Sequence, residues 1–211
     1  MKTLITLVRR EAWEHSAIWL VPVVMSLVLL VLAVMASFGL IDNVSVEVMT
    51  DHSVDARELT GGLAAFNFAL FGWFAMVMSV VATFYLLDCL LADRKDRSIL
   101  FWKSMPVSDV ETVVSKLVFV VWLAPLITIF AIIIAQFFAV SLSSIFVEEG
   151  MSGRIWGASQ IWLRPFELLT TYFMMGIWAL PLCGWVLCVS AWANRLPVLW
   201  ALGVPWSISL L

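Results

Sequence analysis

The residues that could carry catalysis or bind a metal are few in this 211-residue sequence, and they lie far apart. The two histidines, His15 and His52, stand on either side of a long apolar run, and neither has a cysteine or second histidine nearby. The three cysteines lie in apolar stretches without paired metal or redox spacing: Cys89, Cys183 and Cys188. Such cysteines usually pack as small hydrophobic side chains.

Known signatures of hydrolytic and nucleotide chemistry are also missing from the sequence. There is no HExxH motif, no pair of aspartates within an apolar run and no GxxxxGK[ST] loop to hold a nucleotide phosphate. The sequence therefore predicts that the chain is not an enzyme and needs no cofactor or metal. ATP hydrolysis, where it is needed, is expected in another subunit.

The composition is that of a membrane protein. Apolar residues make up 63% of the chain and charged residues only 13%, whereas soluble domains are closer to half apolar and a quarter charged. A soluble fold of this size has too little interior to bury so much apolar surface. The net charge of −3 says little, because the charged residues are segregated along the chain.

Four apolar runs are long enough to cross a bilayer as helices, and none contains Asp, Glu, Lys or Arg. They cover residues 17–40, 68–87, 117–140 and 168–191. A fifth run, 197–211, is too short to span and is still apolar at the last residue, which predicts that the chain is truncated at its C-terminus. The expected fold is an all-α, polytopic transmembrane helical bundle in a single domain, 1–211.

The basic residues between these runs predict the orientation. With the N-terminus in the cytoplasm, nine Lys and Arg fall inside and three, Arg57, Arg154 and Arg164, fall outside. Residues 1–16 mix apolar and charged side chains at helical spacing, which fits either an interfacial helix or a basic flank that fixes topology. The outer loop 41–67 is acidic, and solvation is favoured there over cation binding.

The most informative stretch lies between the second and third runs, at residues 93–108. Five consecutive charged residues, Asp93 to Arg97, are followed by the apolar Ile99 to Trp102, and Pro106 ends the helix. Ser108 and Glu111 have the spacing of a capping box, so a new helix is expected to begin there. The pattern predicts a short amphipathic cytoplasmic helix. It could present side chains to a partner or rest on lipid headgroups, and the residues alone favour neither.

The run DRKDRSILFWKSMPVSD, Asp93 to Asp109, resembles the loop after the second span in bacterial permease subunits of type-2 ABC exporters. The flanking Phe84–Asp88 and Ser115–Leu117 are similar to that family as well, so the specific likeness covers residues 84–117. The predicted N-terminal interfacial helix is similar to the family's connecting helix. Such permeases have more spans than this chain, which ends within its fifth apolar run.

The resemblance implies a membrane-spanning subunit of an ATP-driven exporter in the bacterial cytoplasmic (inner) membrane. A second permease copy would complete the substrate pathway, and a soluble ATP-binding cassette ATPase would drive it. Segment Asp93–Pro106 would be the coupling helix that docks on the ATPase. Its implied contact residues include three apolar anchors, Phe101, Trp102 and Met105. The charged residues that would orient the contact are Arg94, Lys95, Asp96, Arg97 and Lys103, and Pro106 ends the segment.

Two other functions remain open at this point. A structural or regulatory membrane subunit would share the same topology and ordered loop. An ion-coupled secondary transporter is less favoured, because such proteins place ionisable groups within the membrane, whereas Asp88 and Glu167 stand at the ends of apolar runs. No partnership with nucleic acid is indicated, and the substrate cannot be read from these residues.

Overall fold

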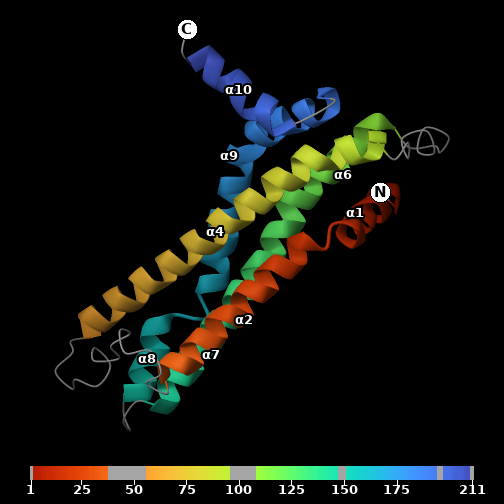
Figure 1. The fold of residues 1–211 in the computed structure, drawn as a ribbon. Coiled ribbons are helices and arrows are strands. Elements are labelled where there is room, and N and C mark those ends of the chain that lie inside the picture. The colour runs from red at the N-terminus through yellow and green to blue at the C-terminus, as the bar shows by residue number, and fades with distance from the viewer. Residues whose placement is uncertain (1, 38–55, 96–107, 147–150, 194–196, 210–211) are drawn as a thin grey trace. The chain divides into compact units, whose positions relative to one another are not determined.

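The computed structural model describes residues 2–37, 56–95, 108–146, 151–193 and 197–209, and every regular element within these ranges is a helix. The predicted all-α class is therefore confirmed. In chain order (Figure 1) the elements are α1 (Lys2–Glu14), α2 (Ala17–Ser37), α4 (Ala56–Lys95), α6 (Asp109–Val118), the π-helix η1 (Phe119–Leu123), α7 (Ala124–Phe146), α8 (Met151–Ser159), α9 (Arg164–Trp192) and α10 (Pro197–Ser209).

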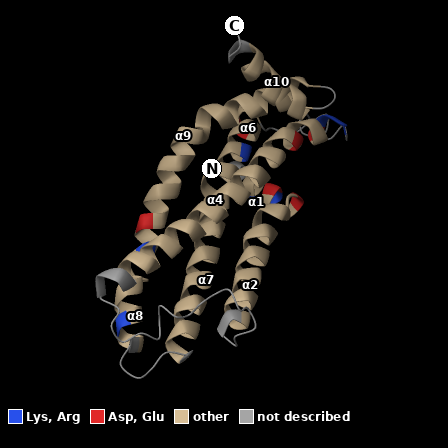
Figure 2. Cartoon of the chain, turned by 60° about the vertical axis from the view of Figure 1, so that its left-hand side comes forward, with Lys and Arg blue, Asp and Glu red and all other residues tan. Residues whose placement is uncertain are grey.

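Four helical stretches are long and apolar enough to cross a membrane: Ala17–Met35, Thr60–Lys95, Asp109–Ile145 and Ser152–Trp192. Figure 2 shows the middle parts of α2, α4, α7 and α9 without charged residues. The expectation of four membrane-length helices is confirmed, and the chain is consistent with a membrane protein.

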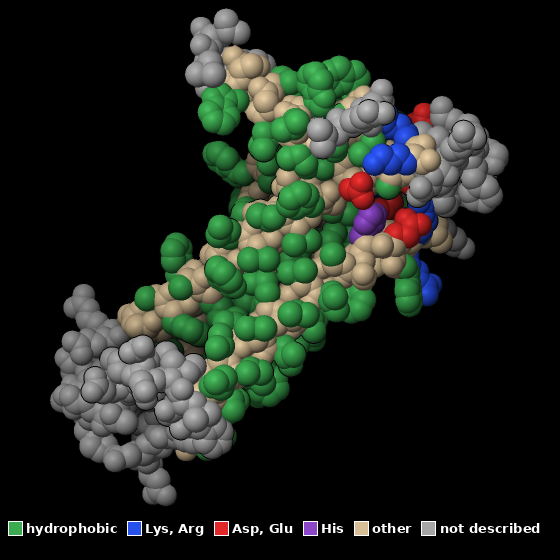
Figure 3. Space-filling model, viewed as in Figure 1, with side chains coloured by type: hydrophobic (Ala, Val, Ile, Leu, Met, Phe, Trp, Pro, Cys, Tyr) green, Lys and Arg blue, Asp and Glu red, His purple; other side chains and the backbone are tan. Residues whose placement is uncertain are grey.

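The surface of these helices is apolar over much of its area (Figure 3). Large side chains stand outward on α4, α7 and α9, and Trp178 on α9 is 85% exposed. In α2 only 11% of the most apolar stretch is buried. Contiguous apolar surface of this extent is unfavourable in water, and the hydrocarbon core of a bilayer would accommodate it.

Helix α4 extends well beyond the apolar run, 68–87, that predicts it. Helix α4 begins at Ala56 rather than at residue 68 and continues past residue 87 to Lys95. Hydropathy marks only the most apolar part of a helix, whereas the backbone hydrogen bonds continue through Gly61, Asn67 and Asp88. The basic Arg94 and Lys95 stand in the last turn, where positive charges interact favourably with the negative end of the helix dipole. The rest of the predicted outer loop, 41–55, lies outside the described residues.

The helices form two compact units, and the first comprises Met1–Ile18, Met78–Pro125 and Tyr172–Leu211. In this unit α1 packs against α6 and η1. The capping box predicted at the start of α6 is confirmed. The Glu111 amide donates to Ser108 Oγ at 3.2 Å, and the Ser108 amide donates to Glu111 Oε2 at 3.3 Å. Helix α6 therefore has a defined beginning just after segment 96–107.

The π-helix η1 ends two residues before Pro125. Proline has no amide hydrogen to donate to the carbonyl of Val121, four residues earlier, and its ring crowds that carbonyl. A single wide turn accommodates both effects without breaking the helix. Helix α9 comes close at this point. A side chain on Gly176 would meet Val121 Cγ1 at 3.1 Å and its carbonyl oxygen at 3.5 Å.

The second unit comprises Trp19–Val77 and Leu126–Thr171. Polar contacts link its helices: Ser26 Oγ of α2 donates to the Ala131 carbonyl of α7 at 3.1 Å, and Gln136 Nε2 of α7 donates to Asn67 Oδ1 of α4 at 2.7 Å. Interhelical hydrogen bonds of this kind contribute about 0.6 to 2 kcal/mol in membrane proteins. An apolar cluster around the buried Val140 and Ile155 packs α7 against α8.

The close approach of α9 to η1 predicts that Gly176→Ile destabilises the protein. The added branched side chain would overpack Val121, at a cost of about 1 to 3 kcal/mol. Gly184→Ile, on the same helix, is the matched control, because a side chain there meets nothing within 4 Å. Thermal unfolding in detergent micelles should show a lower midpoint for Gly176→Ile alone. Equal midpoints for the two variants would contradict the described packing.

Candidate functional site: a buried ion-pair network

The lysine of α6, Lys116, is buried in the first unit with its charge paired to two carboxylates. Its side chain is 1% exposed, and its Nζ lies 2.8 Å from Glu11 Oε1 and 3.2 Å from Asp93 Oδ2. Glu11 belongs to α1 and Asp93 to α4, so one ammonium group joins three helices. A buried charge is tolerated only when it is paired and hydrogen-bonded, and Lys116 meets this condition.

Glu11 is the centre of the network and is itself buried. Its Oε1 accepts from Lys116, and its Oε2 accepts from the Tyr85 hydroxyl of α4 at 2.6 Å. His15 Nε2 lies 3.8 Å from the same Oε2. The Tyr85 ring contacts the His15 ring edge-on, with centroids 4.6 Å apart, and packs on Phe119 of η1 at 5.3 Å. The carboxylate thus has a polar partner at each oxygen and aromatic rings around it.

Arg10 extends the network toward the surface. Its Nη2 lies 3.4 Å from Asp93 Oδ1, and its Nε donates to Glu14 Oε1 at 2.6 Å. Partial burial by itself lowers the pKa of the Arg10 guanidinium, but the hydrogen bond and charge of Glu14, with Asp93 and Glu11 nearby, outweigh it and raise that pKa. Arg10 and Lys116 therefore offset the charges of Glu11 and Asp93, and Glu14 stands exposed at the edge.

Helical spacing explains why these residues meet. On α1 the buried Leu7 and Glu11 are four residues apart, and His15 follows four residues later. On α4 Tyr85, Cys89 and Asp93 repeat the same interval and share one face. On each helix the polar members of the network thus lie at helical spacing among apolar residues. Figure 3 shows charged side chains gathered near α1 and the C-terminal end of α4 on the face in view.

The two predicted coupling residues that the structure describes stand at the end of α4. Arg94 Nη2 donates to the carbonyls of Ser190 at 2.8 Å and Ala193 at 2.7 Å, at the C-terminal end of α9. Ser190 Oγ in turn donates to the Leu87 carbonyl at 2.7 Å. The Arg94 guanidinium is thus engaged within the chain, where it satisfies carbonyls that a helix end leaves unpaired, whereas the side chain of Lys95 is exposed.

The other predicted contact residues lie outside the described residues: Asp96, Arg97, Phe101, Trp102, Lys103, Met105 and Pro106. The structure does describe both flanks of their segment. Asp93 precedes it and Lys116 follows it, and these two residues form an ion pair with each other. The network therefore joins the two flanks directly.

Sequence reasoning does not find the network. It places Asp93 in the predicted cytoplasmic helix and uses the basic residues of α1 and α6 only to predict the orientation. The available signal was positional: Glu11 and Lys116 each interrupt an apolar stripe at helical spacing. What the sequence could not supply was the pairing, because the three helices are distant along the chain.

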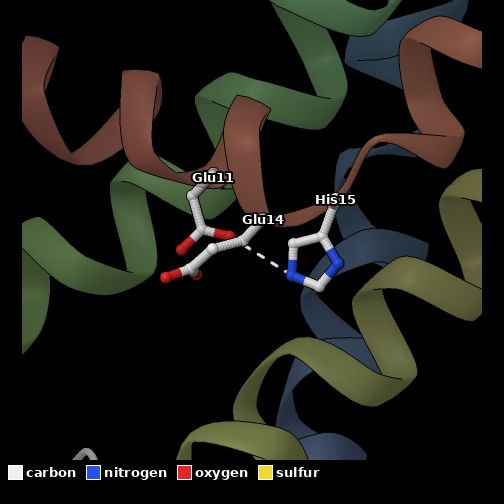
Figure 4. A group of neighbouring side chains, drawn as sticks. All are labelled: Glu11, Glu14 and His15. Carbon is white, nitrogen blue, oxygen red and sulfur yellow. Dashed lines mark ion pairs between the residues drawn. The ribbon is translucent and has the colours of Figure 1, made fainter.

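Glu11, Glu14 and His15 also place ligand-type atoms within 4.8 Å of one another (Figure 4). The Glu11 oxygens already accept from Lys116 and Tyr85, and Glu14 already accepts from Arg10. A divalent cation would have to displace or approach two positive side chains. The arrangement favours an ion-pair network over a metal centre.

The network predicts that Lys116→Met destabilises the protein strongly. The change leaves the buried Glu11 carboxylate without its ammonium partner, and breaking a buried pair from one side costs about 3 to 5 kcal/mol. Lys95→Met is the matched control, because Lys95 is exposed on α4 and its removal should change stability by less than about 0.5 kcal/mol. The free energy of unfolding in detergent micelles measures both. A Lys116→Met variant as stable as the control would contradict the described pairing.

Comparison of the chain with protein-family models, with curated proteins and with solved structures finds no match.

Proposed function

We propose that this chain is the membrane-spanning permease subunit of an ATP-driven, ABC-type exporter. It would form the substrate pathway with a second permease copy and couple to a separate ATP-binding cassette ATPase through the Asp93–Pro106 segment. The resemblance of Asp93–Asp109 to the coupling loop of such permeases supports the proposal. The observation that carries it is the ion-pair network, because it joins both flanks of that segment to α1.

The network gives the segment a mechanical connection to the rest of the unit. Asp93, at the end of α4, pairs with Lys116 of α6, and both pair with residues of α1. Helix α6 continues through η1 into α7 as one candidate span, and α4 belongs to another. A displacement of the segment by a docked ATPase would therefore act on α1 and on two membrane-length helices together.

The proposal also fixes the location of the protein. The N-terminus and the segment after α4 would face the cytoplasm, where ATP and the ATPase are present, and the membrane would be the bacterial inner membrane. The excess of Lys and Arg on that side supports this orientation. Helix α1, which buries Leu7 and Glu11 on one face and exposes Ile5, Arg9 and Trp13 on another, would lie in the cytoplasmic interface.

Ion-coupled transport is the second candidate, because the network places ionisable groups on membrane-length helices. An ion site needs a carboxylate that is free to bind the ion, however. Glu11 and Asp93 are both paired with Lys116, so the described contacts favour a structural use of these charges. A regulatory membrane subunit differs from the proposed permease in having no ATPase partner, and one experiment separates the two.

The proposal predicts that an ATP-binding cassette ATPase co-purifies with the chain and that the variant Phe101→Ala, Trp102→Ala loses it. Buried aromatic anchors often contribute about 2 kcal/mol or more each to an interface, so the double change should reduce recovery well over tenfold. Membranes of the native bacterium would be extracted in mild detergent, and the recovered ATPase identified by mass spectrometry and ATP hydrolysis.

The matched control is Trp162→Ala, Phe166→Ala, which removes the same two residue types from exposed positions just before α9 and in its first turn. Both variants must reach the membrane at wild-type levels. The proposal requires the ATPase to stay with the wild type and the control alone. Failure of the wild type to bring down an ATPase would favour the regulatory subunit, and equal recovery from both variants would place the docking site elsewhere.

A further inference from the structure

A groove runs along one face of α4 in the first unit. Its volume is about 680 Å³, and its walls are α4 itself, the junction of α1 and α2, and the beginning of α10. The residues that matter here are Val80, Phe84, Asp88 and Lys95 on α4, His15 at the junction and Val198 on α10. All belong to the same compact unit.

Along α4 the lining of the groove changes from apolar to charged. Val80 and Phe84 line its apolar part, Asp88 follows one turn later, and Lys95 comes last. With a rise of 1.5 Å per residue, Asp88 stands about 12 Å along the helix from Val80, and Lys95 about 10 Å further. A long molecule lying in the groove would thus meet hydrocarbon first, then a carboxylate and only then an ammonium group.

Asp88 has no role in the ion-pair network. It is exposed into the groove, and it makes no ion pair with any residue in the part of the chain that the structure describes. Asp93, little more than one turn later, is not part of the groove lining and pairs with Lys116 and Arg10. A carboxylate on a membrane-length helix is costly to keep, and such residues usually bind a ligand, an ion or a partner.

We propose that this groove binds an amphiphilic cation, with its alkyl chain against Val80 and Phe84 and its ammonium group beside Asp88. Phe84 is 60% exposed and offers a ring to the alkyl chain or to the cation. The order of the charged residues selects this class. An anionic head group next to an alkyl chain would lie beside Asp88 and be repelled. Lys95 stands further along α4, so the head group would have to pass Asp88 to reach it.

The groove shares two residues with the network. His15 and Tyr85 line it and also contact Glu11. A bound cation would therefore touch the side chains that surround the central carboxylate. Binding itself requires only this chain, so it can be tested whether or not the chain is part of an ATP-driven exporter.

The test uses the full chain in lipid nanodiscs and a photoactivatable alkyl-trimethylammonium label. Three competitors share one tail: dodecyltrimethylammonium, dodecyl maltoside and dodecyl sulfate, each below its micellar concentration. We expect label on α4 near Phe84 and on the beginning of α10, mapped by mass spectrometry. The cationic competitor should displace the label at a concentration at least tenfold lower than the neutral one, and the anionic competitor should be weakest.

Two variants in the same groove distinguish the roles of its two charged residues. Asp88→Asn should weaken the apparent affinity of the cation about tenfold, the factor that corresponds to about 1.4 kcal/mol. Lys95→Met should leave it unchanged or strengthen it, because a like charge is removed. Glu167→Gln, which removes a carboxylate from α9 outside the groove, controls for general attraction of cations and should have no effect.

Any of three results would overturn the proposal. The first is an Asp88→Asn variant that binds the cation as well as the wild type does and keeps its helix content by circular dichroism. The second is a neutral competitor that equals the cationic one, which would mean that the groove takes up bilayer lipid without regard to charge. The third is dodecyl sulfate binding best and losing its affinity in Lys95→Met, which would assign the groove to anionic amphiphiles.

Discussion

The buried charge of Lys116 determines how the helices of the first unit pack. Lys116 is almost fully removed from solvent, and an unpaired ammonium in such a place would cost several kcal/mol. Glu11 and Asp93 must therefore stay beside it, which holds α1 and the end of α4 against α6. The Tyr85 hydroxyl and the Arg10 guanidinium complete the arrangement by binding the second oxygen of Glu11 and of Asp93, respectively.

The same ion pairs explain how the charged helix α1 is bound to an otherwise apolar chain. Hydrophobic burial alone specifies little between membrane helices, because lipid competes for the same apolar surfaces. Directional contacts then determine which helix faces meet. In the first unit these are the ion pairs of Lys116 and the Arg94 hydrogen bonds to the end of α9. In the second unit Gln136 and Asn67 join α7 to α4, and Ser26 joins α2 to α7.

The fold class could be predicted from the sequence because length and apolarity suffice to recognise a membrane helix. The Ser108–Glu111 capping box was also predictable, since both partners lie within one turn. The extent of α4 was underestimated, because helix continuation through Asn67 and Asp88 depends on backbone hydrogen bonds rather than on hydropathy. The network could not be predicted, because Glu11, Tyr85 and Lys116 meet only through tertiary packing. Most residues predicted to contact an ATPase lie in segment 96–107, outside the described residues, so their role stays a prediction.

The most direct test of the central claim is a double-mutant cycle between Glu11 and Lys116. Glu11→Gln, Lys116→Met and the double variant would be compared by their free energies of unfolding in detergent micelles. If the two side chains share a buried ion pair, the double variant should be more stable than the sum of the single effects predicts, by at least about 1 kcal/mol. Single effects that add to within about 0.5 kcal/mol would show that the two residues act independently and would contradict this account.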